Sequence, residues 1–161
     1  MVDHDALQGP ALLAAAFELA ATVHAGQVDQ AGLPYLSHPM RVAAQLVPEG
    51  DLAVAAGLLH DVVEDSATTI DDLRAAGMPP EVCTAVDALT KRPDEGYEQA
   101  VARAAAHPLA ATVKAADLAD NSDPARLALL DPDTRERLEA KYALGRQLLE
   151  EHSSGHPDLE R

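Results

Sequence analysis

The segment GLLHDVVEDS at residues 57–66 concentrates a histidine and three acids within six positions: His60, Asp61, Glu64 and Asp65. Imidazole and carboxylate groups are ligands for divalent zinc, iron or manganese, and a bound cation offsets the repulsion between neighbouring acids. On a helix of about 100° per residue, the four polar side chains fall within about 140° of arc, opposite the apolar ones. The pattern predicts an amphipathic helix whose polar face is either an ordinary solvated surface or part of a metal site.

A solvated surface explains Glu64 and Asp65, but it explains less well why His60 and Asp61 directly follow the apolar run AGLL. A metal site needs ligands from other segments, because two adjacent ligands do not hold an ion. One candidate is His38, which lies in the segment PYLSHP, a predicted loop stiffened by two prolines.

The other candidate ligand is Asp117, in the segment VKAADLADN. On a helix, Asp117 shares a face with Lys114 at i−3 and Asn121 at i+4. An acid, an amide and a lysine on one face of an otherwise apolar helix suit contact with a polar ligand.

Four sequence motifs occur in the order HAGQ, GLPYLSHP, LLHDVVED and VKAADLADN. Together they resemble the hydrolase domain of RelA/SpoT homologues, which belong to the HD superfamily of metal-dependent phosphohydrolases. They cover residues 23–121. Those enzymes remove the 3′-pyrophosphate from (p)ppGpp, and the short chain is similar to their stand-alone, hydrolase-only branch. The adjacent His60 and Asp61 alone are a weak pattern, whereas the four motifs together are specific to this family.

The resemblance implies that one metal, usually Mn²⁺ in this family, is bound by His38, His60, Asp61 and Asp117. It also implies that Glu64 and Asp65 are the catalytic acids that position or deprotonate the attacking water, and that Asn121 contacts the nucleotide. These roles are chemically consistent. A bound metal lowers the pKa of its water and neutralises phosphate charge, and carboxylates one turn further on can accept the proton.

The chain departs from the family at Asp29, because the family has a basic residue nine positions before the loop histidine that contacts the guanine end of the nucleotide. An acid there repels phosphate and cannot stack on a base as arginine does. The reaction type is therefore better supported than the substrate. One alternative is an HD phosphohydrolase for another nucleotide or phosphoester. A second is a non-catalytic metal- or nucleotide-binding module, against which the intact Glu64 and Asp65 count.

Lys91, Arg92 and Tyr97, in LTKRPDEGYEQ, are candidate substrate-binding residues that could supply the missing basic and stacking contacts. The segment TKR is equally consistent with the C-terminus of a helix that has no role in binding, because the helix dipole favours cations there. Arg126 is similarly open between a surface salt bridge and a phosphate contact.

Other residues have structural interpretations. We expect His24 to hold a neighbouring loop, Tyr35 to pack its loop, and both Cys83 and Tyr142 to lie in the core.

Composition and helix signals predict how these residues are positioned. The 161 residues suit one domain, and a 47% hydrophobic share with 2% aromatics implies a core of Ala, Leu and Val. Such residues favour close-packed helices. We expect an all-α HD-domain bundle of about eight helices over residues 1–152, with the first from Pro10 to Gly26 and the last from about Asp133 to His152. A flexible tail is expected over 153–161.

The formal charge of −15 argues against binding of nucleic acid or an anionic membrane, but it allows a small anionic nucleotide beside a local cation. No stretch is long and apolar enough to span a membrane. The single cysteine, Cys83, excludes an internal disulfide framework and fits a reducing cytoplasm. The abundance of Ala and Arg over Lys and Ile suggests a bacterial source, and an Ala-rich helical surface could support a homodimer.

Overall fold

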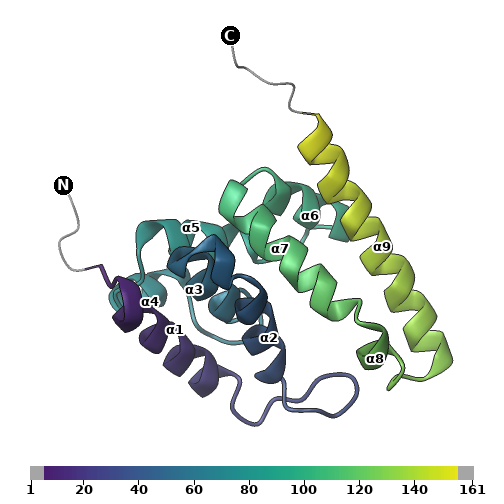
Figure 1. The fold of residues 1–161 in the computed structure, drawn as a ribbon, viewed down its shortest axis with the longest axis horizontal. Helices are drawn as coiled ribbons and strands as arrows, with labels where there is room; N and C mark the ends of the chain where they lie inside the picture. The colour runs from purple at the N-terminus through teal and green to yellow at the C-terminus, as the bar shows by residue number, and fades with distance from the viewer. Residues whose placement is uncertain (1–5, 156–161) are drawn as a thin grey trace.

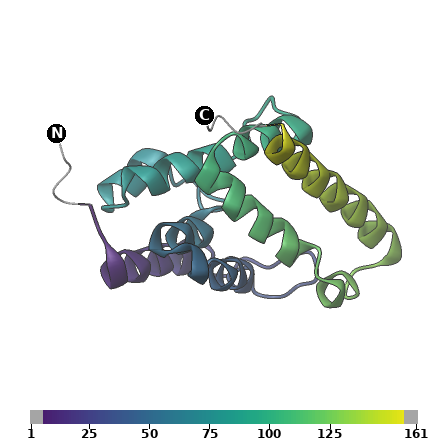
Figure 2. The same ribbon diagram turned by 45° about the horizontal axis from the view of Figure 1, so that its top comes forward.

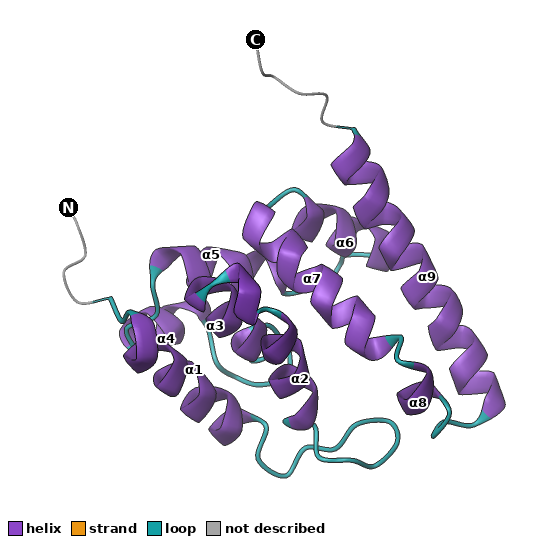
Figure 3. Ribbon diagram, viewed as in Figure 1, coloured by secondary structure: helices purple, strands orange, loops and turns teal. Residues whose placement is uncertain are grey.

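The computed structural model describes residues 6–155, and every regular element in that range is helical (Figures 1 and 3). An isolated β-bridge joins Val28 to Pro34 in a loop. The described part contains nine α-helices and one 3₁₀ turn: α1 (Gly9–Val23), α2 (Ser37–Gln45), η1 (Val47–Glu49), α3 (Asp51–Leu59), α4 (Ile70–Ala75), α5 (Pro80–Leu89), α6 (Tyr97–Ala105), α7 (Pro108–Asn121), α8 (Pro124–Leu127) and α9 (Pro132–Ser154). The prediction of an all-α fold is confirmed.

Helix α3 forms the centre of the fold and contacts α1, α2, α5 and α7. Most of its side chains are Ala or Leu, and six of its nine residues are buried, from Ala53 to Leu59. Gly57 lets α2 approach closely, because a β-carbon there would lie 2.6 Å from Leu46 Cδ1. Small residues thus bring α2 and α3 close together, and the proposed ligands His38 and His60 lie on or directly after these two helices.

Helix α7 lies between two groups of helices, contacting α2, α3 and α5 on one side and α6 and α9 on the other (Figures 1 and 2). The long helix α9 packs on α6 and α7. Gly145 of α9 is buried, and a β-carbon there would overlap the hydroxyl of Tyr97 and approach Leu118 to 3.1 Å. Asp117 therefore faces a region bounded by both groups.

The buried core consists mainly of Leu, Val and Ala, as the composition predicted, and includes Cys83 at 1% exposure. Thr69 begins α4 with a reciprocal capping box to Asp72. Within residues 6–155, no helix combines the length and apolar composition that a membrane crossing requires.

Several predicted boundaries are wrong. Helix α2 begins at Ser37, so His38 lies in the first turn of a helix and not in a loop. The four-residue helix α8 was not expected, and α9 continues to Ser154, two residues beyond the predicted domain limit. The remainder of the predicted tail from residue 156 lies outside the described residues.

The predicted helix through residues 57–66 is also wrong, because α3 ends at Leu59 and a turn follows. The His60 side chain explains the ending. Its Nδ1–H donates to the carbonyl of Gly57 at 2.6 Å, and thus takes an acceptor that the continuing helix would use. Three acids in the next turn would also oppose the negative end of the helix dipole.

Candidate active site

Two buried imidazole rings meet between α2 and the end of α3. His38 and His60 are each 3% exposed, and their Nε2 atoms lie 3.2 Å apart. The Nδ1 atoms point away, that of His38 to Asp120 Oδ2 at 2.6 Å and that of His60 to the Gly57 carbonyl. Because both of these partners accept hydrogen bonds, neutral rings carry their hydrogen on Nδ1 and expose the Nε2 lone pairs to each other.

Two carboxylates complete this arrangement. Asp61 Oδ2 lies 3.0 Å from His60 Nε2, and Asp117 Oδ1 lies 3.0 Å from His38 Nε2 and 3.4 Å from His60 Nε2. We call these four residues the His–Asp cluster. Ligand atoms of His38, His60 and Asp61 all lie within 4.8 Å of one another, as a shared metal ion would require. The four residues predicted as ligands therefore converge.

The electrostatics of the His–Asp cluster require positive charge at its centre. Burial lowers the pKa of His60, but Asp61 and Asp117 outweigh it and raise that pKa well above its ordinary value. Burial raises the pKa of Asp61, yet His60 brings it down to about 2. Four lone-pair donors in contact repel one another unless protons or a cation lie between them. Two imidazoles and two carboxylates are a suitable donor set for a borderline divalent metal.

Neighbouring side chains hold both carboxylates in place. The hydroxyl of Tyr35 donates to Asp61 Oδ2, Lys114 Nζ donates to Asp117 Oδ2 at 2.9 Å, and Asn121 Nδ2 donates to Asp117 Oδ1 at 3.0 Å. The predicted shared face of Lys114, Asp117 and Asn121 is confirmed. The sequence interpretation of Tyr35 as loop packing missed its contact with Asp61.

Sequence reasoning missed Asp120, which is 5% exposed and binds three cationic or polar side chains. Its carboxylate accepts from His38 Nδ1, from Arg41 Nε at 2.7 Å and from Arg126 Nη1 at 2.7 Å. Burial raises the pKa of Asp120, but the hydrogen bonds from His38 and Arg41 lower it to about 2. Its position at i+3 from Asp117 was an available signal, because the two carboxylates lie on neighbouring parts of one helix face.

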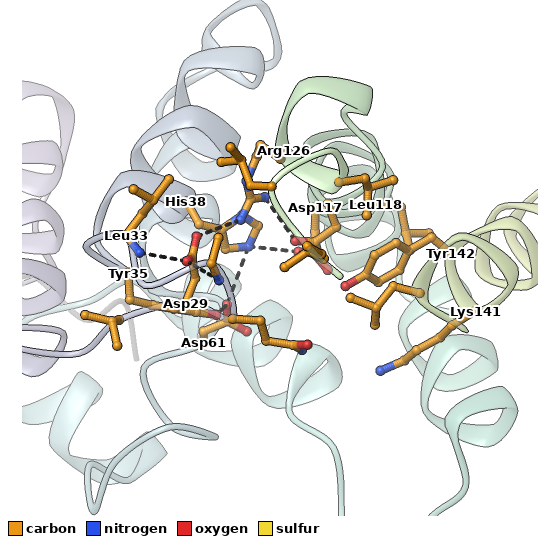
Figure 4. Close-up of a pocket in the computed structure, with 18 of the residues that line it drawn as sticks. Asp29, Leu33, Tyr35, His38, Asp61, Asp117, Leu118, Arg126, Lys141 and Tyr142 are labelled. Carbon is orange, nitrogen blue, oxygen red and sulfur yellow. Dashed lines mark hydrogen bonds and ion pairs between the residues drawn. The ribbon is translucent and has the colours of Figure 1, made fainter. Parts of the chain in front are cut away.

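A cavity of about 410 Å³ lies beside the His–Asp cluster. Figure 4 shows His38, Asp61 and Asp117 on its inner side, Asp29 and Leu33 of the α1–α2 loop on one wall, and Lys141 and Tyr142 of α9 across from them. Tyr142 was expected in the core, and the structure places it on this wall, because α9 presents that face to α7.

Asp29, at the position where the sequence lacks the expected cation, has several partners. Its Oδ1 accepts the backbone N–H groups of Ala31 and Leu33, each at 2.9 Å. Its Oδ2 lies 3.4 Å from Arg126 Nη2. Asp29 therefore shapes the loop turn and pairs with a cation from α8. Between the two interpretations of Arg126, the structure shows the salt bridges, although Arg126 also lines the cavity.

The two predicted catalytic acids lie differently. Glu64 lines the cavity, and its Oε1 accepts the backbone N–H of Lys91 at 2.8 Å. Asp65 is exposed beside it and does not belong to the cavity lining. Neighbouring protein atoms nevertheless displace part of the water around the Asp65 carboxyl, and this desolvation, with the charges of Asp61 and Glu64, raises the pKa of Asp65 to about 6.

Of the predicted substrate-binding residues, Asn121 and Tyr97 line the cavity, whereas Lys91 and Arg92 do not. The guanidinium of Arg92 donates to the carbonyls of Asp87 and Thr90 at the end of α5, as expected for a cation at a helix C-terminus. The hydroxyl of Tyr97 is buried and lacks a hydrogen-bond partner among the described residues.

Two further residues complete the surroundings of the site. Lys141 of α9 places its Nζ 4.9 Å from the Tyr97 ring centroid. The prediction that His24 holds a neighbouring loop is confirmed, because its Nδ1 pairs with Gln27 Oε1 at 2.8 Å. Gln27 Nε2 in turn donates to the Asp65 carbonyl at 3.3 Å.

Comparison with known proteins places this geometry in a family. The profile described as an HD domain matches residues 16–122, which include every residue of the His–Asp cluster. A solved structure titled "A metazoan ortholog of SpoT hydrolyzes ppGpp and plays a role in starvation responses" superposes with a TM-score of 0.69 and 25% identity. The alignment covers 93% of this chain and 99% of that one.

Curated relatives agree over shorter segments. The guanosine-3′,5′-bis(diphosphate) 3′-pyrophosphohydrolase of Aquifex aeolicus is 30% identical over 116 residues, which are 66% of this chain and 16% of that protein. The GTP pyrophosphokinase of Myxococcus xanthus is 38% identical over 78 residues, 47% of this chain and 10% of that protein. The match thus spans a small part of the length of both relatives.

Proposed function

Because this chain belongs to the HD domain family, we propose that it is a metal-dependent phosphohydrolase that removes pyrophosphate from (p)ppGpp. The observation that carries the proposal is the convergence of two imidazole Nε2 atoms and two carboxylates beside a 410 Å³ cavity. The names of the Aquifex relative and of the metazoan structure support the choice of reaction and substrate.

In this mechanism, His38, His60, Asp61 and Asp117 bind one divalent ion, for which we propose Mn²⁺. When bound, the ion supplies a water of lowered pKa and neutralises phosphate charge. The remaining steps belong to the protein. Tyr35 donates to Asp61 and Lys114 donates to Asp117, so that both carboxylates, which would hold the ion, keep one orientation within the His–Asp cluster.

Glu64 and Asp65 are proposed to orient the attacking water and accept its proton. Glu64 is the better placed for contact with substrate, because it lines the cavity and its carboxylate is fixed by the Lys91 N–H. Asp65 lies one residue further along the same turn and is suited to pass the proton to solvent, because it is exposed.

For substrate binding, we propose Asn121 and Tyr97, which line the cavity, together with Lys114 and Lys141, which are cations in the same lining. Lys91 and Arg92 remain predictions that the side-chain positions do not favour. The charge of −15 makes a small nucleotide more suitable than a nucleic acid, and the single cysteine favours a cytoplasmic location. Self-association through an Ala-rich surface stays a prediction.

Asp29 favours a second candidate, a phosphohydrolase for another nucleotide or phosphoester. Because Arg126 pairs with both Asp29 and Asp120, its charge is shared by two carboxylates and is less available to a phosphate. The substrate group that lies against the α1–α2 loop is then better uncharged than phosphorylated.

The test is incubation of the purified protein with ppGpp and Mn²⁺, with product separation by chromatography and an Asp61→Ala control. Release of GDP and pyrophosphate by the unaltered protein alone supports the main proposal. Metal binding without these products contradicts (p)ppGpp as substrate. A panel of nucleotides and phosphoesters then separates the second candidate, which turns one of them over, from a non-catalytic binding module, which turns over none.

A further inference from the structure

The two histidines of the His–Asp cluster are oriented by different partners. His60 Nδ1 donates to the backbone carbonyl of Gly57, which no substitution removes. His38 Nδ1 instead donates to the side chain of Asp120, 82 residues away in the sequence. The orientation of His38 therefore depends on one replaceable carboxylate.

The environment of His38 Nε2 makes this dependence sharp. Nε2 lies 3.0 Å from Asp117 Oδ1 and 3.7 Å from Asp61 Oδ2, and both atoms are hydrogen-bond acceptors. A neutral ring with its hydrogen on Nε2 would donate to Asp117 and would have no lone pair for a metal there. An acceptor at Nδ1 has to compete with these carboxylates to keep Nε2 free.

We infer that Asp120 is a positioning residue for the metal site: it holds the hydrogen of His38 on Nδ1 and so presents Nε2 as a ligand atom. This inference rests on the proposed metal binding, but it does not depend on which substrate is hydrolysed.

The surroundings of Asp120 are built to hold the carboxylate in one orientation. Arg41 of α2 donates through Nε to Oδ1 at 2.7 Å and through Nη2 to Oδ2 at 3.2 Å. Arg126 of α8 donates to Oδ2 at 2.7 Å. Two guanidinium groups from different helices thus fix the plane of a carboxylate that is 5% exposed, and its Oδ2 stays aimed at His38.

The experiment compares Asp120→Ala with Asp120→Asn in the full chain. Asparagine keeps an oxygen that can accept a hydrogen bond from His38 Nδ1. It loses the negative charge that makes the Nε2 atom of the ring a more basic metal ligand. We expect Mn²⁺ affinity, measured by calorimetry, to fall ~10- to 100-fold in the alanine variant and less in the asparagine variant.

A second readout is independent of metal and activity. Nitrogen-15 spectra of the metal-free protein, at a pH where both rings are neutral, report which ring nitrogen carries hydrogen. We expect His38 to shift from the Nδ1–H form toward the Nε2–H form in Asp120→Ala. His60 serves as the internal control and should not change, because its partner is the Gly57 carbonyl.

Asp123→Ala is the matched control variant. Asp123 caps α8 by accepting the N–H of Ala125, so its loss costs local stability near Asp120 without touching His38. Its Mn²⁺ affinity should stay within about twofold of the unaltered protein, while a similar loss in both variants would overturn the inference by making the effect one of general stability.

Unchanged His38 tautomer and unchanged affinity in Asp120→Ala would also overturn it. If that variant does not fold, Asp120→Asn decides: a loss of about threefold or more supports a positioning role, and unchanged affinity contradicts it. Failure of the unaltered protein to hydrolyse ppGpp would contradict the proposed substrate but leave both readouts intact.

Discussion

The His–Asp cluster and the outer wall of the cavity are built in opposite ways. In the cluster, His38, His60 and Asp117 are at most 5% exposed, and each has a fixed partner. On the outer wall, formed by the α1–α2 loop and the segment after α8, the apolar side chains Val28 and Leu129 are 63% and 59% exposed. The contrast indicates a centre whose geometry is set for one chemistry and a wall that can be altered without rebuilding the core.

Polar side chains connect the two regions. Tyr35 of the α1–α2 loop donates to Asp61 of the cluster. Arg126 also joins the two regions, since it contacts Asp120 on the side of the cluster and Asp29 on the side of the wall. Changes inside the cluster should therefore abolish metal binding, whereas changes at wall residues other than Tyr35 and Arg126 should alter substrate use alone.

The largest effect is expected for Asp61→Ala. The substitution removes one of the two carboxylates and leaves His60 Nε2 without its 3.0 Å neighbour. We expect loss of metal retention during purification and loss of turnover. Elemental analysis and the ppGpp assay measure the two, and a variant that keeps full activity would remove the proposed metal site.

Glu64→Gln should separate chemistry from metal binding. The amide cannot accept a proton, and general acid–base groups contribute typically ~10²- to 10⁴-fold to rate. Because the amide oxygen of the introduced glutamine would still accept the Lys91 N–H, the turn should keep its shape. We expect kcat to fall by about 100-fold or more with unchanged metal content. Unaltered kcat would mean that another group takes the proton.

The residues at the centre could be predicted from sequence because their chemistry is local. His60, Asp61 and Asp117 each lie in a short segment whose residue types suggest a metal ligand. The structure brings all three to His38. The helical arc drawn for residues 57–66 was nevertheless wrong, because the His60 side chain competes for the Gly57 carbonyl. Hydrophobic periodicity does not report that competition.

The helix position of Asp120 was an available signal, but the contacts that give Asp120, Arg126 and Tyr142 their roles could not be predicted, because they join distant segments. Asp120 and His38 are 82 residues apart, and Arg126 and Asp29 are 97 apart. Each of these residues is individually consistent with a surface ion pair or a core position. Their relation to the cavity depends on how α7, α8 and α9 pack.

Tyr35→Phe should produce an intermediate effect, because it removes one hydrogen bond at the edge of the cluster. Burial and the charge of Asp61 raise the pKa of Tyr35, so the hydroxyl remains a donor to Asp61 Oδ2. We expect Mn²⁺ affinity to fall about 10-fold, measured by calorimetry, with little change in the folded structure. Tyr142→Phe is the control, since Tyr142 lines the cavity away from Asp61, and its metal affinity should be unchanged.

Asp29→Asn is expected to have the smallest effect and to act only at the wall. The asparagine side chain retains an oxygen that can accept the N–H groups of Ala31 and Leu33. An Asp29→Arg substitution would be a poorer test, because it would remove both of these hydrogen bonds and place a second guanidinium group beside Arg126. Removal of the negative charge lessens the repulsion of phosphate at the wall and leaves Asp120 as the carboxylate that Arg126 still contacts, so KM for an anionic nucleotide should fall about two- to fivefold, in line with the modest worth of one ion pair near the surface. Steady-state kinetics should show unchanged kcat and calorimetry unchanged Mn²⁺ affinity. A fall in metal affinity would instead mean that the loop and the His–Asp cluster are coupled through Arg126 and Asp120, and the two regions would then act as one unit.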